Sequence, residues 1–203
     1  MGQAASATAG FHAISAGQLK GSARGALVCA CFGSAWMYWA VVLSGHLTPL
    51  WFSTVTLPAV VLIALAILRV RAFRRLIPSP AELAHWRRYR RFFWIDVGIE
   101  WGLGGASVFL LSRFGRADLI PQVFGVIIGL HFLPLVKIFR APRLYWTGSI
   151  IAVGAVGSLL LPRGEVRNVA GCASIGLTLW ATAVIILWRI SSASESQSAS
   201  TIS

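Results

Sequence analysis

The sequence predicts an all-α membrane protein: a compact bundle of six transmembrane helices with a short interfacial helix before the third. Only 12% of the 203 residues are charged, which is about half the usual fraction of a soluble domain. The hydrophobic residues, 57% of the chain, lie in six continuous runs, each close to the ~20 residues that cross a bilayer. Because these runs do not alternate between polar and apolar positions, they favour helices over the strands of a membrane barrel.

The spans follow one another with short connections. We expect a disordered cytoplasmic tail over 1–25, a transmembrane domain over 26–190 and a disordered, Ser-rich cytoplasmic tail over 191–203. The six spans are expected at about 26–44, 50–68, 92–111, 119–139, 144–161 and 169–188. Four of the five connections are short, so sequence neighbours should pack as antiparallel hairpins. Pro58 and Pro134 lie inside the second and fourth spans and are expected to kink them.

The net charge of +12 is divided unevenly between the two sides of the predicted bundle. If both termini share one side, that side holds every Lys and Arg except four, which are Arg113, Arg116, Arg163 and Arg167. The positive-inside rule then places both termini in the cytoplasm, and we expect a bacterial inner-membrane protein. The charge therefore indicates orientation and contact with anionic phospholipids. Nothing beyond the charge suggests a nucleic-acid partner.

A basic segment precedes the third span. Ser79, Pro80 and Glu82 have the pattern of a helix start with a capping box. Basic and aromatic residues alternate from there to Phe92, and the basic ones include Arg87, Arg88, Arg90 and Arg91. Such a helix can lie in the membrane interface with its guanidinium groups on lipid phosphates, or it can run directly into the third span. It would act as a lipid sensor, as a docking site or only as a topology anchor.

Ionisable residues inside the spans are the candidate functional residues, because they are costly to hold in a bilayer. Asp96 and Glu100 lie four residues apart and so project from one face of the third span, with Ser107 on the same face. His131, in the fourth span, is expected at the same depth as Glu100, about 12 Å from the cytoplasmic surface. We therefore expect a contact between Glu100 and His131 across the hairpin.

Asp96 is expected nearer the cytoplasmic surface, within reach of Lys137 or Arg91. With Glu100 and His131 it would form a polar track through the cytoplasmic half of the membrane. A carboxylate and a histidine in contact can exchange a proton near neutral pH, which suits a small proton- or ion-coupled transporter. The same residues could instead fix the register of two helices, hold a divalent metal or serve an intramembrane enzyme.

The fourth span has further unusual residues. Gln122 near its start is a supporting polar residue, and the spacing of Gly125 and Gly129 is typical of a helix-packing surface. Pro134 leaves the carbonyl of Leu130 without its helical partner, beside His131.

We find no motif for a cofactor and expect none. A bundle this small could need a second copy to enclose a pathway. The alternative function is a non-transporting accessory or lipid-interacting protein that acts through residues 79–92.

Overall fold

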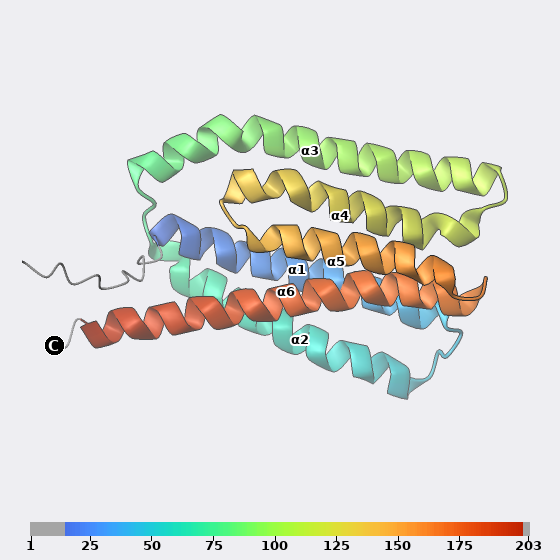
Figure 1. Ribbon diagram of the computed structural model, residues 1–203. Coiled ribbons are helices and arrows are strands. Elements are labelled where there is room, and N and C mark those ends of the chain that lie inside the picture. The colour runs from blue at the N-terminus through green and yellow to red at the C-terminus, as the bar shows by residue number, and fades with distance from the viewer. Residues whose placement is uncertain (1–14, 201–203) are drawn as a thin grey trace, which may run out of the picture.

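The computed structural model describes residues 15–200 of the chain, with side chains as far as Ser192. This part is helical and has no strand. Six of its helices are long and apolar enough to cross a membrane, and they run up and down along one bundle (Figure 1). They are α1 (Ala16–Leu43), α2 (Pro49–Ala72), α3 (Pro80–Arg113), α4 (Ile120–Phe139), α5 (Arg143–Gly157) and α6 (Glu165–Ser200). Single 3₁₀ turns follow α2, precede α4 and follow α5, and the last of them extends the candidate span of α5 to Leu160.

The first helix begins at Ala16 rather than near residue 26, so the expectation of disorder over 16–25 is wrong. Ser15 caps it: its hydroxyl accepts a hydrogen bond from the backbone N–H of Gln18 at 3.2 Å. The Gln18 side chain accepts one from the backbone N–H of Ser15, also at 3.2 Å. This capping box satisfies two N–H groups that a helix start leaves free. The expected disorder of residues 1–14 falls outside the described residues.

The last helix continues to Ser200, through a Ser-rich stretch for which we expected disorder. Serine can stay helical when its hydroxyl bonds to its own helix. The Ser191 hydroxyl donates to the carbonyl of Leu187 at 2.8 Å and also accepts from the Arg69 guanidinium on α2 at 2.7 Å. These contacts hold the helix beyond the expected span. Residues 201–203 lie outside the described part of the chain.

The third helix is continuous from Pro80 to Arg113. The predicted capping box is confirmed: the Ser79 hydroxyl accepts from the Glu82 backbone N–H at 3.3 Å. The Glu82 carboxylate accepts from the Ser79 backbone N–H at 2.7 Å. The basic segment is therefore the first part of α3 and not a separate short helix, which agrees with the second of the two forms considered above.

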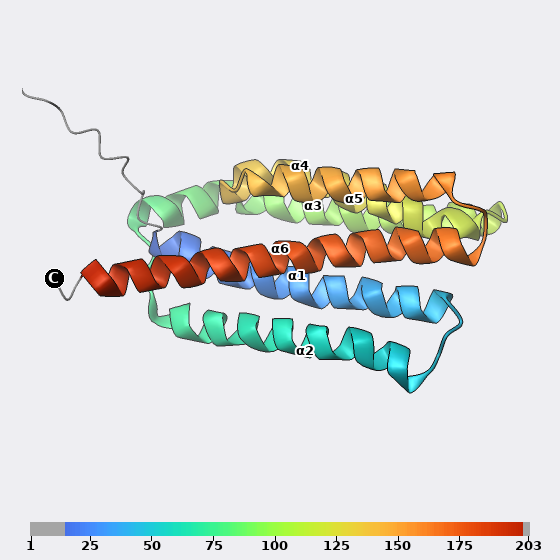
Figure 2. The same cartoon turned by 60° about the horizontal axis from the view of Figure 1, so that its bottom comes forward.

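The six helices lie in three rows in Figure 2: α2 alone, then α1 with α6, then α4 and α5 with α3. The long helices α1 and α6 pack against each other in the middle, and α2 covers one side of this pair. The hairpin of α4 and α5 covers the other side, and α3 lies outermost and packs chiefly on α4. The start of α1 and the end of α6 lie at one end of the bundle, called the terminal end below, and the opposite end is called the far end (Figure 1).

Glycine pairs bring the central helices close together. A methyl group at Gly129 would lie 2.6 Å from the carbonyl oxygen of Gly148 on α5, and one at Gly33 of α1 would lie 3.0 Å from that of Gly176 on α6. The expected packing role of Gly129 is thus confirmed. By contrast, Gly105 on α3 has no neighbouring helix within 4 Å. Large apolar side chains instead point outward along the bundle, which suits a membrane-embedded protein.

Candidate functional site

The candidate site lies where α3 meets α4. The imidazole of His131 is held between two carboxylates of α3. Its Nδ1 lies 3.0 Å from Oδ2 of Asp96, and its Nε2 lies 3.5 Å from Oε2 of Glu100. The His131 side chain is 12% exposed, and those of Asp96 and Glu100 are 18% and 24% exposed. The three groups are therefore largely shielded at the helix interface.

The spacing of the two acids explains this arrangement. Asp96 and Glu100 are one helical turn apart, which separates them by about 6 Å along α3. The two nitrogens of an imidazole lie at different edges of the ring, so a single ring placed between the acids can face both. Because α4 runs antiparallel to α3 after a short connection, His131 returns to the depth of these residues. Both acids therefore share one histidine.

The contact with Asp96 has a particular character. Asp96 Oδ2 and His131 Nδ1 are both shielded from solvent, and neither makes an aligned hydrogen bond within the described part of the structure. Their 3.0 Å approach is therefore an electrostatic contact. Each ring nitrogen of His131 therefore faces one carboxylate oxygen of α3, in a place where water screens charge poorly.

A groove of about 520 Å³ opens beside this site. Its polar lining residues are Asp96 and Lys137, with the phenols of Tyr89 on α3 and Tyr145 on α5. The rest of its wall is apolar and comes from α3 and α4. Neither Glu100 nor His131 lines the groove, so Asp96 lies between the groove and the histidine.

The structure brings together three of the predicted site residues. The expected contact of Glu100 with His131 is present. Asp96 contacts His131 as well, where we expected Lys137 or Arg91 as its neighbour. Lys137 lines the same groove as Asp96, but no ion pair joins them among the described residues. His131 contacts both acids from α4, whereas Lys137 is exposed and lies six residues further along α4 toward the terminal end.

Ser107 lies outside the site. Its hydroxyl donates to the carbonyl of Leu103, four residues earlier on the same helix, at 2.7 Å. A serine in a helix commonly satisfies its hydroxyl in this way. Ser107 shares a helical face with Asp96 by its spacing, but its hydroxyl bonds within its own helix and not to the acids.

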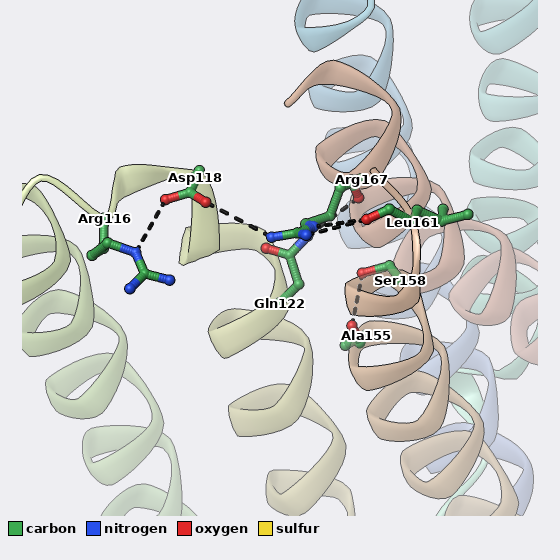
Figure 3. A network of polar contacts seen from close by, with 7 residues as sticks. All are labelled: Arg116, Asp118, Gln122, Ala155, Ser158, Leu161 and Arg167. Atoms are coloured by element: carbon green, nitrogen blue, oxygen red, sulfur yellow. Dashed lines mark hydrogen bonds and ion pairs between the residues drawn. The ribbon is translucent and has the colours of Figure 1, made fainter. Parts of the chain in front are cut away.

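Gln122 also lies apart from the site, in a polar network at the far end (Figure 3). It is about 14 Å from His131 along α4, by the helical rise. Its side-chain amide donates to the backbone carbonyl of Arg167 at 3.2 Å. The Arg167 guanidinium donates to the Leu161 carbonyl at 3.1 and 3.3 Å and lies 3.8 Å from Asp118. The network ties the start of α4 to the start of α6.

Sequence reasoning treated Arg167 only as one of the basic residues on the outer side. We expected neither that Arg167 would be buried, with only 8% of the residue exposed, nor that it would pair with Asp118. A charged residue beside the start of an apolar run, with an acid in a neighbouring loop, is the signal that could have indicated this pair.

The four arginines of the basic segment are exposed along the first part of α3. None of them forms an ion pair within the described residues, and Arg88 lies over the ring of Tyr89 at 5.9 Å. Glu82, the acid that precedes them on α3, instead contacts the hydroxyl of Ser15. His85 fixes this part of α3 to α4, since its Nε2 lies 2.9 Å from the Ile138 carbonyl. The arginines are thus available to anions outside the chain.

The donors of the site do not converge as metal ligands. Within the described residues, no group of three or more His, Cys, Asp or Glu side chains is placed to hold a metal ion. Asp96 and Glu100 face different nitrogens of His131, so one ion could not contact all three side chains as they are arranged. The alternative of a divalent metal at Asp96, Glu100 and His131 is therefore not supported by the geometry.

No family model, curated protein or solved structure matches this chain.

Proposed function

We propose that the protein is a small proton-coupled membrane transporter in which His131 passes protons between Asp96 and Glu100. The observation that carries this proposal is the placement of one imidazole between two carboxylates, with a different ring nitrogen facing each. A neutral imidazole has one N–H and one free nitrogen. It can therefore accept a proton at one edge and release a proton from the other.

The groove supplies the access that such a relay needs. Asp96 lines the groove and also faces His131, so it can exchange protons with the outside and with the ring. Glu100 receives the proton from the other nitrogen. The partial shielding of all three side chains keeps water from bypassing the relay and strengthens the interactions between their charges.

The orientation of the transporter belongs to the proposal too. The terminal end of the bundle carries the excess of Lys and Arg residues, so the positive-inside rule places this end in the cytoplasm. We infer a bacterial inner membrane, with the groove and Asp96 in its cytoplasmic half. The exposed arginines of the basic segment would contact anionic phospholipids there.

Proton flux through reconstituted vesicles tests the relay. A potassium diffusion potential is imposed on the vesicles, and an enclosed pH-sensitive dye reports proton entry. Wild-type protein should give a flux above that of protein-free vesicles, and His131→Gln, Asp96→Asn and Glu100→Gln should each reduce it to background. The matched controls are His46→Gln and Glu165→Gln, which change an exposed histidine and an exposed acid at the far end. A wild-type flux at background, or a His131→Gln flux equal to the wild type, would contradict the proposal.

A second candidate function has one specific observation in its favour. The exposed arginines of the basic segment have no acidic partner in the described part of the chain, which suits a non-transporting protein that recognises anionic lipid. This function predicts that neutralising Arg87, Arg88, Arg90 and Arg91 weakens binding to anionic vesicles, while His131→Gln has no functional effect. The flux experiment separates the two candidates.

A further inference from the structure

We propose that the groove beside Asp96 binds one anionic phospholipid, with the lipid phosphate at Lys137 and an acyl chain along the apolar wall. The groove lies at the α3–α4 junction toward the terminal end of the bundle, and its volume of about 520 Å³ falls within the usual range of small-molecule sites. The inference shares Asp96 and the groove with the proposed relay but does not require proton transfer. A lipid bound there would cover Asp96, so the relay would exchange protons through the groove only while the lipid is absent.

The charge at the mouth of the groove favours an anion. Lys137 is exposed and lines the groove, and no carboxylate lies within ion-pair distance of it among the described side chains. Asp96 is the nearest acid in the lining, but it faces His131 at 3.0 Å. Glu82 is held by Ser15 and by its own helix cap. The ammonium group is thus left without a counter-charge from this part of the chain.

The wall of the groove favours a ligand with a long apolar part. Ile95 and Ile99 on α3 and Leu133 on α4 line it, and all three are exposed to the outside of the bundle. Inorganic phosphate could satisfy Lys137 but has no part that would lie against these side chains. An acyl chain that runs parallel to the helices would pack against all three of them.

The rim of the groove suits a lipid head group. The phenols of Tyr89 and Tyr145 lie in the lining with Lys137, and a phenol can donate a hydrogen bond to a phosphate oxygen. Tyrosine is also a common residue at the level of lipid head groups. The order from polar rim to apolar wall therefore matches the order from head group to chain in a phospholipid of the cytoplasmic leaflet.

Photolabelling in vesicles tests this site. The full-length protein is reconstituted in phosphatidylcholine with a trace of phosphatidylglycerol that carries a diazirine on its acyl chain, and labelled peptides are mapped by mass spectrometry. We expect labelling at 92–99 and 133–138, several times stronger than with a diazirine phosphatidylcholine. Lys137→Gln should lower the phosphatidylglycerol labelling about fivefold, since one basic residue near a membrane contributes about 1 kcal/mol. Arg140→Gln, which removes an exposed cation that does not line the groove, should leave it unchanged.

A steric variant gives an independent readout. Leu133→Trp should fill the groove and abolish the labelling at 92–99, whereas Leu130→Trp, at an exposed leucine outside the lining, should preserve it. Equal labelling by both lipids, a Lys137→Gln signal equal to wild type, or an equal loss in Arg140→Gln would overturn the proposal. Because labelling is measured without a proton gradient, its failure is distinguishable from failure of the relay.

Discussion

At the scale of single residues, the candidate site consists of one histidine with two acidic neighbours. The contact of Glu100 with His131 was predictable because helical rise alone places both at one depth. The contact of Asp96 with the other nitrogen was not, because depth does not fix the orientation of an imidazole ring. Nor could the sequence show that Ser107 satisfies its hydroxyl within its own helix.

A double-mutant cycle measures the coupling between Asp96 and His131. We expect Asp96→Asn and His131→Gln to show an interaction energy of about 0.5–3 kcal/mol in the free energy of unfolding, which is typical of contacting polar residues. The measurement is reversible unfolding in detergent micelles. The control cycle combines Ser107→Ala with His131→Gln and should show no coupling. An Asp96–His131 coupling no larger than that of the control would contradict the contact.

At the scale of the helices, the apolar runs predicted all six elements but not their ends. An apolar run reports the part of a helix that lies in hydrocarbon, whereas the end of a helix depends on its caps. The capping box at Ser79 was recognised because Pro80 and Glu82 mark it. That at Ser15 was missed because small polar residues fill the whole segment, although Gln18 completes the same pattern.

Close packing of α4 on α5 gives a second prediction. Gly129→Ala places a methyl group against the Gly148 carbonyl and the Ala152 side chain. It should destabilise the protein by about 1–3 kcal/mol through overpacking. Gly105→Ala, on a helix face with open space, should be neutral or stabilise by up to about 1 kcal/mol through helix propensity. Thermal unfolding of both variants in one detergent provides the comparison. An equal effect of the two substitutions would refute the close packing of α4 on α5.

At the scale of the whole molecule, the sequence predicted the up-and-down order of the helices but not which of them pack side by side. The central pairing of α1 with α6 joins the two ends of the chain, and neither helix has a formal charge in its apolar core to reveal it. The far-end network of Asp118 and Arg167 adds a connection between α4 and α6 that spacing alone could not show.

The proposed orientation predicts which loops face the outside of the cell. Ile77 lies in the connection of α2 to α3 and is 86% exposed, and Leu47 lies in the connection of α1 to α2 and is 60% exposed. In a cysteine-free background, Leu47→Cys should react with a membrane-impermeant maleimide added to intact cells, and Ile77→Cys should react only after lysis. The reverse pattern would invert the orientation. Labelling of both sites in intact cells would contradict a membrane crossing by α2, which is the helix that connects them.

Chemical rescue of the histidine tests whether protons pass through the ring of His131. In reconstituted vesicles, His131→Ala removes the ring between Asp96 and Glu100 and leaves space for a free imidazole. We expect a proton flux at background for this variant and a flux that rises as imidazole is added, with no such rise in protein-free vesicles or in His46→Ala. A wild-type flux in His131→Ala without imidazole would contradict the relay.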